Sequence, residues 1–122
     1  MNQKIKSIRP FIGAKDFAVS RAFYRDLGFE EVEIDPKFSV FKKGDFAFYL
    51  QDYYSKEWIE NTIIFLEIEN VDLYWDELVS LNLKEKYNSI RLVPIKTEVW
   101  GKECFLLDPA GVLWHFGEFF TT

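Results

Sequence analysis

Few side chains in this sequence could carry chemistry. Of the 122 residues, one is a histidine, His115, and one is a cysteine, Cys104. An imidazole can bind a metal, move a proton or gain charge near neutral pH. A catalytic metal site needs about three ligands, and no carboxylate or nucleophile stands at a recognisable spacing from His115. We therefore expect His115 to contact a ligand or form a structural hydrogen bond, and Cys104, in an apolar run, to be a buried small hydrophobe.

Aromatic residues are the second group of side chains that could contact a ligand. There are 13 Phe, 6 Tyr and 4 Trp, which together make 19% of the sequence. One domain-sized core would not normally use so many rings. Some of them are therefore expected to face a ligand, where ring stacking contributes roughly 0.5 to 1.5 kcal/mol per pair beyond the area buried.

Charge and hydropathy exclude several classes of function. The chain has 15 Lys and Arg against 20 Asp and Glu, which gives a net charge of −5. Clustered basic residues drive phosphate binding, so this balance argues against a nucleic-acid partner. No apolar run approaches the roughly 18 residues of a membrane span, and the first eleven residues do not resemble a signal peptide. We expect a cytoplasmic protein with no membrane partner.

Two segments have the periodicity of amphipathic helices. In the first, Asp16 can cap the N-terminus and Gly28 fits the left-handed position that ends a helix. The second begins after the cap residue Asn70, and Asn82 can replace glycine at its end. The predicted helices are 17–27 and 71–81.

Short apolar runs typical of strands surround both helices. One run precedes each helix and three follow it, which predicts the order βαβββ twice and an α+β fold. Turn sequences such as Asp108-Pro109-Ala110-Gly111 separate the runs, and the stretch 52–61 is expected to link the halves. The predicted strands are 8–13, 29–34, 38–42, 46–51, 62–68, 90–95, 98–106 and 112–119.

Two stretches also carry a family resemblance. The first ends in Phe23-Tyr24-Arg25-Asp26-Leu27-Gly28-Phe29, which is similar to an "FYxxxLGF" motif with one spacer residue missing. The second runs from Trp100 to Phe116 and looks like a "WG-x-E-(4)-DPxG" hairpin that ends in His-Phe. Both resemble the vicinal oxygen chelate superfamily, which includes glyoxalase I, extradiol dioxygenases, fosfomycin-resistance enzymes and bleomycin-resistance proteins. The His-Phe ending is similar to the bleomycin-binding branch.

The resemblance implies a fold and an organisation. We expect a single domain over residues 1–122, in which two βαβββ modules, at about 1–57 and 58–122, form a cupped mixed sheet. Relatives in the bleomycin-binding branch are homodimers whose ligand crevice lies between two subunits, often with the first strand exchanged. The resemblance therefore also implies a homodimer.

The superfamily's enzymes hold a divalent ion with His, Gln or Glu side chains from four strand positions. Those positions carried onto this chain hold Arg9, Phe48, Ile63 and His115. Arginine cannot bind a cation, and neither isoleucine nor phenylalanine offers a lone pair. The resemblance therefore favours a protein without a metal cofactor, although a metal-dependent lyase or dioxygenase of the same superfamily stays an alternative.

Strand alternation assigns faces once Ile63 and His115 are taken to point into the groove. Trp114 and Phe116 then belong to the core. The side chains expected on the groove face are Phe46, Phe48, Leu50, Ile63, Phe65, Glu67, Leu113 and His115.

The resemblance adds particular ligand contacts. Phe38 and Trp100 match the stacking positions of the bleomycin-binding branch, and Phe65 matches a groove-wall aromatic. Gly101 beside Trp100 is expected to leave space for a ligand. Glu67 stands where that branch has another aromatic, and its charge suits a cation.

Together these features favour a dimeric protein that sequesters a planar, cationic, bleomycin-like small molecule without reacting with it. The expected ligand-binding residues are Phe38, Phe48, Phe65, Glu67, Trp100, Gly101 and His115. A binder of another metabolite and a regulatory module are further alternatives.

Overall fold

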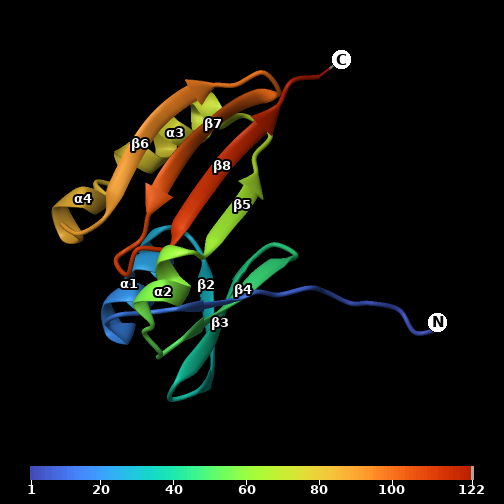
Figure 1. Ribbon diagram of the computed structural model, residues 1–122, viewed down its shortest axis with the longest axis vertical. Coiled ribbons are helices and arrows are strands. Elements are labelled where there is room, and N and C mark those ends of the chain that lie inside the picture. Colours follow the sequence, from blue (N-terminus) through green and yellow to red (C-terminus); the bar gives the residue numbers. More distant parts are fainter. Residues whose placement is uncertain (122) are drawn as a thin grey trace.

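The computed structural model describes residues 1–121, which form two four-stranded sheets with helices against them (Figure 1). The first half contains β1 (Phe11–Gly13), α1 (Phe17–Asp26), β2 (Glu30–Asp35), β3 (Phe38–Lys43) and β4 (Phe46–Gln51). The second half contains α2 (Lys56–Glu60), β5 (Ile63–Glu67), α3 (Val71–Ser80), α4 (Leu83–Lys86), β6 (Arg91–Thr97), β7 (Gly101–Leu107) and β8 (Leu113–Phe119).

Both sheets have the same topology. The strand order is β1-β4-β3-β2 in the first sheet and β5-β8-β7-β6 in the second sheet. In each, the opening strand pairs parallel with the last strand of its module, and the other pairs are antiparallel. The predicted α+β fold with two βαβββ modules is confirmed.

The two main helices begin where the sequence predicts and end one residue earlier than predicted. The Asp16 carboxylate accepts a hydrogen bond from the Val19 amide at the start of α1, and the Asn70 side chain accepts one from the Leu73 amide at the start of α3. Asn82 takes the left-handed conformation, with φ 52°, directly after α3. The Asp16 and Asn70 side chains satisfy amides that a helix leaves without partners.

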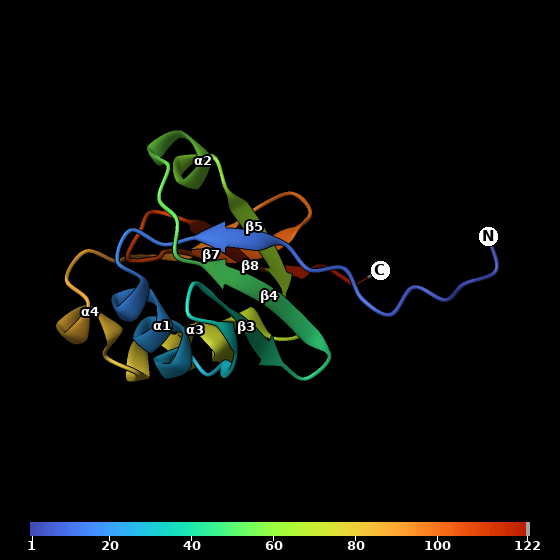
Figure 2. The same cartoon turned by 90° about the horizontal axis from the view of Figure 1, so that it is seen from below.

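Two short helices were not predicted. Helix α2 lies in the expected linker, where the Ser55 hydroxyl caps it by accepting from the Trp58 amide. Helix α4 follows directly after Asn82. The first strand is also shorter than the predicted 8–13, and the chain before Phe11 extends away from the sheets (Figures 1 and 2). No helix within residues 1–121 is long and apolar enough to cross a membrane.

A buried chain of hydrogen bonds joins the two modules. The Tyr24 hydroxyl, on α1, donates to Asp108 Oδ2 at 2.6 Å and accepts from Trp114 Nε1 at 2.8 Å. Asp108 Oδ1 accepts from the amides of residues 110, 111 and 112 in the β7–β8 turn. Burial raises the pKa of the Asp108 carboxyl above its ordinary value, against the opposing effect of these hydrogen bonds. A single phenol thus ties α1 to the β7–β8 turn and to β8.

Replacing Tyr24 with phenylalanine is expected to lower the free energy of unfolding by about 1 to 3 kcal/mol, because Asp108 and Trp114 would each lose a buried partner. Chemical denaturation followed by circular dichroism measures the loss. Tyr74→Phe is the matched control, since no hydrogen bond joins the Tyr74 hydroxyl to residues 1–121. Equal losses in the two variants would contradict the structural role of the Tyr24 hydroxyl.

A second network, made of ion pairs and hydrogen bonds, joins α1 to the first sheet. Arg21 Nε lies 2.7 Å from Glu31 Oε2, Arg25 Nη1 lies 2.5 Å from Glu31 Oε1, and the Ser39 hydroxyl donates to Oε2 at 2.7 Å. Burial alone would raise the pKa of the Glu31 carboxyl. The hydrogen bonds from Arg21, Ser39 and Arg25 outweigh it and hold that pKa below its ordinary value.

A carboxyl whose pKa is lower in the folded state stabilises the protein above the unfolded-state pKa and loses that contribution as the pH falls through the folded-state pKa. Glu31→Gln should therefore lower stability by about 1 kcal/mol near neutral pH. The difference from the parent protein should shrink once the pH falls below the ordinary range of a glutamate. Urea unfolding across the acid range measures it, and a difference that stays constant with pH would be inconsistent with this linkage.

Candidate functional site

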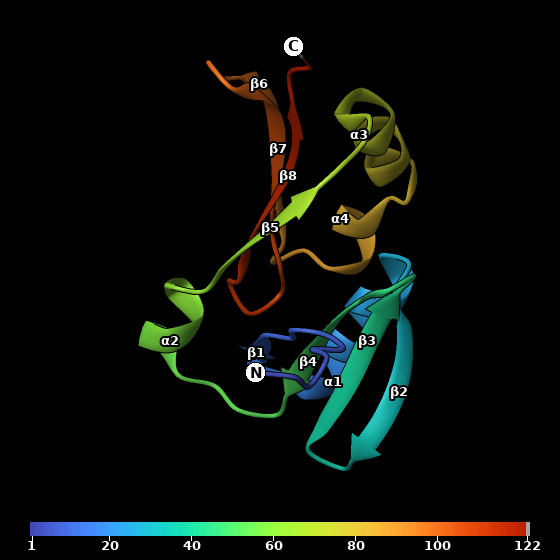
Figure 3. The same ribbon diagram turned by 90° about the vertical axis from the view of Figure 1, so that its right-hand side faces the viewer.

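The second sheet has one covered face and one open face. Helix α3 packs on β6, β7 and β8, and Figure 3 shows α3 and α4 on the same side of this sheet. Trp114 and Phe116 point to the helices and are buried, as predicted. Ile63, Phe65 and Glu67 are exposed on the other face. The predicted alternation of β5 and β8 is confirmed.

Three aromatic rings meet on the open face, and we call Phe65, Trp100 and Phe119 the ring cluster. The Trp100 ring centroid lies 6.0 Å from that of Phe65 and 5.0 Å from that of Phe119, and Phe65 and Phe119 are 5.8 Å apart. Phe65 and Phe119 remain 43% and 49% exposed. Glu67 borders the cluster, opposite Gly117 of β8. The cluster offers ring faces to a flat ligand, and Glu67 offers a negative charge.

Glycine at position 117 makes room for this cluster. A Cβ there would lie 2.5 Å from the Phe65 ring and 3.2 Å from the Trp100 ring. The Phe65 ring therefore lies directly over the β8 backbone. Sequence reasoning missed Gly117, although it lies two residues after His115 and so on the same strand face.

Gly101 has a different role from the predicted one. A Cβ at this position would collide with the backbone of Glu118, the residue that follows Gly117. The space that its missing side chain leaves is filled by β8, so the expectation that Gly101 makes room for a ligand is wrong. Its physical role is to let β7 and β8 approach closely beside Trp100.

Gly117→Ala is expected to displace the Phe65 ring while the fold is kept, because the ring can move into open solvent. The neighbouring Trp100 should then change its fluorescence maximum. Steady-state emission of the variant measures this change. The same substitution in a Trp100→Phe background is the control, and an equal spectral change there would show that another tryptophan responds.

His115 has a carboxylate partner that sequence reasoning missed. Its Nδ1 lies 2.8 Å from Oε1 of Glu103, which is 7% exposed on the neighbouring strand β7. The sequence could have predicted this pair, because the Asp108–Gly111 turn indicates a hairpin in which Phe105 lies opposite His115. Glu103 then shares the face of His115, one diagonal step away.

A second aromatic group lies on the first sheet. Phe11 stacks on Tyr49 with centroids 4.6 Å apart, and Phe38 lies 5.9 Å from Tyr49 and 6.2 Å from Phe11. Arg9 donates to the Tyr49 hydroxyl at 3.4 Å and lies over its ring. Within residues 1–121, no ring of this group contacts the ring cluster. Within one chain the two predicted stacking residues are thus apart, with Phe38 on β3 of the first sheet and Trp100 in the β6–β7 turn of the second sheet.

The expected groove position of Phe48 is wrong. Phe48 is 3% exposed and Leu50 is fully buried, and both belong to the core. Phe48 stacks on its cross-strand neighbour Phe41 at 5.6 Å and packs edge-on against Tyr24 at 4.9 Å. Alternation places Tyr49, not Phe48, on the face that carries Phe11 and Phe38.

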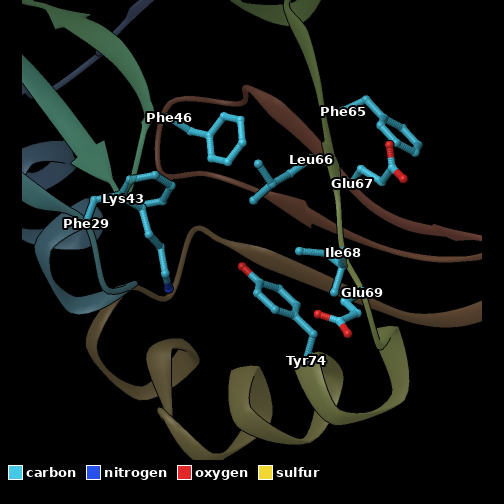
Figure 4. A pocket seen from close by; sticks show the side chains of 9 residues that line it. All are labelled: Phe29, Lys43, Phe46, Phe65, Leu66, Glu67, Ile68, Glu69 and Tyr74. Carbon is cyan, nitrogen blue, oxygen red and sulfur yellow. The ribbon is translucent and has the colours of Figure 1, made fainter.

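A cavity of about 750 Å³ lies between the modules, on the helix side of β5 (Figure 4). Leu66 and Ile68 point into it toward Phe46 and Tyr74, whereas Phe65 and Glu67 point away. The full lining is Phe29, Lys43, Phe46, Phe65, Leu66, Glu67, Ile68, Glu69 and Tyr74. Most of this cavity therefore lies on the face of β5 opposite to the ring cluster, and Phe65 and Glu67 border its edge.

Solved structures with this architecture are known. The bleomycin resistance determinant encoded on transposon Tn5 aligns with a TM-score of 0.80 at 20% identity, over 96% of this chain and 100% of that chain. The bleomycin-binding protein from bleomycin-producing Streptomyces verticillus, complexed with copper(II)-bleomycin, aligns with a TM-score of 0.78 at 23% identity, over 93% and 96%. This chain has the glyoxalase/bleomycin-resistance fold. The resemblance inferred from the two sequence stretches is confirmed at the level of the fold.

The glyoxalase/bleomycin-resistance fold hosts proteins of different function. A lactoylglutathione lyase from Agrobacterium tumefaciens aligns with a TM-score of 0.64 at 18% identity, over 95% of this chain and 96% of that chain. No protein-family model and no curated protein matches the sequence. The function must therefore be argued from the side chains of the site.

The donor atoms on this fold do not fit the divalent ion of the superfamily's enzymes. Phe48 lies in the core, and Arg9 is engaged with Tyr49. His115 brings one further donor, the carboxylate of Glu103. Within residues 1–121 no three His, Cys, Asp or Glu side chains are grouped so that they could hold a metal. Burial also raises the pKa of the Cys104 thiol to about 11, which disfavours the thiolate.

Proposed function

We propose that this protein is a small-molecule binder that holds a planar, cationic, bleomycin-like ligand against the ring cluster without reacting with it. The observation that supports the proposal best is the cluster of Phe65, Trp100 and Phe119 on an open sheet face, bordered by Glu67. Large rings normally bury themselves, so rings left half-exposed together mark a contact surface.

The chemistry of this surface selects the class of ligand. Each ring can stack on a flat conjugated system, and a cation over a ring face adds about 0.5 to 1 kcal/mol at an exposed site. Glu67 adds a negative charge beside the rings, and the acidic excess of the whole sequence favours the approach of a cation. An anionic ligand would be repelled by Glu67, which is exposed beside the rings.

A second copy of the chain would complete the site. An open sheet face covers only one side of a flat ligand, and the Phe11, Phe38 and Tyr49 group lies on a separate sheet of the same chain. In a homodimer, the first sheet of one subunit can face the second sheet of its partner, so that rings contact both sides of the ligand. The binding unit is then residues 1–122 as one domain in a homodimer, and we place it in the cytoplasm.

The extended N-terminal segment supports association between chains. Ile5 and Ile8 are 88% and 93% exposed, and the backbone before Phe11 forms no strand. Apolar side chains in an extended segment are poorly accommodated in water and suit pairing with another chain. Light scattering at micromolar concentration should therefore give the mass of a dimer, and a monomer would contradict this assembly.

The proposal is tested by titrating the protein with bleomycin while tryptophan fluorescence is recorded. Binding should quench the fluorescence because Trp100 is part of the proposed stacking surface. The quenching should saturate at one ligand per chain. In Trp100→Ala most of the quenching should vanish, and calorimetry should show affinity weakened about tenfold. Trp75→Phe is the matched control, since Trp75 packs against the core, and it should keep both quenching and affinity.

Two results would overturn the proposal. One is unchanged fluorescence and no heat of binding with bleomycin and a panel of flat cations. The other is a stoichiometric Ni, Zn, Fe or Mn content in the purified protein, which would favour a metal-dependent lyase or dioxygenase instead. Elemental analysis measures that content directly.

A further inference from the structure

The pair of His115 and Glu103 has a geometry that fixes the position of one proton. Nδ1 of His115 lies 2.8 Å from Oε1 of Glu103, and the side chains are 25% and 10% exposed. An ionised carboxylate has no hydrogen to donate, so the hydrogen between the two atoms must be on Nδ1. When the ring is neutral, its other nitrogen, Nε2, is then a hydrogen-bond acceptor.

The surroundings hold the imidazole in place. The Phe105 ring packs edge-on against it at 4.8 Å and 73°, and Phe65 of the ring cluster lies 6.4 Å away. Lys96 lies opposite Glu103 in the β6–β7 register, but its ammonium pairs with Glu98 at 3.3 Å. Within residues 1–121, His115 is therefore the only ion-pair partner of the Glu103 carboxylate.

The free nitrogen of this imidazole is accessible. Nε2 makes no hydrogen bond within the described residues and is not among their buried, unpartnered atoms. His115 lies opposite Phe65 in the parallel β5–β8 register, so both side chains are on the open face. An acceptor atom is thus presented beside the aromatic surface.

We propose that Glu103 is a positioning residue that locks His115 in the Nδ1–H tautomer, so that Nε2 accepts a hydrogen bond from an N–H group of the ligand held on the ring cluster. The ligand half of this inference rests on the proposed function, whereas the tautomer does not. According to this inference, His115 makes the protein prefer flat cations that carry an N–H donor at their edge over flat cations that lack such a donor.

The tautomer is measured on the ligand-free protein by long-range ¹H–¹⁵N correlation at a pH where the ring is neutral. His115 is the only histidine of the chain, so its signals need no assignment. The spectrum should show hydrogen on Nδ1 and a bare Nε2, the reverse of the preference of free histidine in water. In Glu103→Gln the Nδ1–H population should fall, because a carboxamide can also donate to Nδ1.

A matched control removes one charge elsewhere. Glu60→Gln, on exposed α2, should leave the tautomer unchanged. Circular dichroism shows whether Glu103→Gln keeps the fold. If the variant does not fold, the spectrum of the parent protein alone decides which tautomer is present. A parent protein with hydrogen on Nε2, or a Glu103→Gln variant with an unchanged tautomer, would overturn the inference.

The ligand half is tested with bleomycin as the probe. Saturation should shift the Nε2 resonance, and Glu103→Gln should weaken binding about five- to tenfold, the effect of one hydrogen bond. Binding with neither change would overturn the role of Nε2 while leaving the proposed function intact. Absence of binding would overturn the proposed function and the ligand half together, whereas a wrong tautomer overturns only the inference.

Discussion

The buried hydroxyl of Tyr24 fixes how the two modules pack against each other. Tyr24 is fully buried, and its hydroxyl is both the donor to Asp108 and the acceptor for Trp114. A buried polar group without a partner is costly, so α1 can pack against the second module only where all three groups meet. Because Trp114 is held inward in this way, strand alternation turns its neighbour His115 outward. The side chains that β8 presents on the open face are therefore determined by the contact of Trp114 with Tyr24 in the core.

This arrangement divides the aromatic surplus between the buried core and the open face. Tyr24, Phe41, Phe48 and Trp114 pack together in the core. Phe65, Trp100 and Phe119 lie outside it, and Gly117 removes the side chain that would otherwise stand beneath the Phe65 ring. Under the proposed function, the close packing of the core beneath this sheet would hold the ring cluster in place before a ligand binds.

Sequence reasoning succeeded where the signal was local. The caps Asp16 and Asn70, the left-handed Asn82 and the alternation along β5 and β8 all follow from interactions within a few residues. It failed on β4, where apolar residues occur on both strand faces, so alternation alone did not show that Phe48 faces the core. The pairing of Phe41 with Phe48 decides the face, because cross-strand neighbours share one side of a sheet.

The sequence by itself determined the two main helices, the order of the strands and the resemblance to a known fold, because these depend on periodicity, caps and turns. Only the tertiary structure decided which side chains meet. The contact of Glu103 with His115 and the lie of Phe65 over Gly117 depend on which strands are neighbours and on their register. The separation of Phe38 from Trp100 depends on the pairing of β3 into the first sheet and of β6 and β7, which flank Trp100, into the second sheet. Strand order and register are properties of the whole chain, since residues far apart in sequence must pair before either is defined.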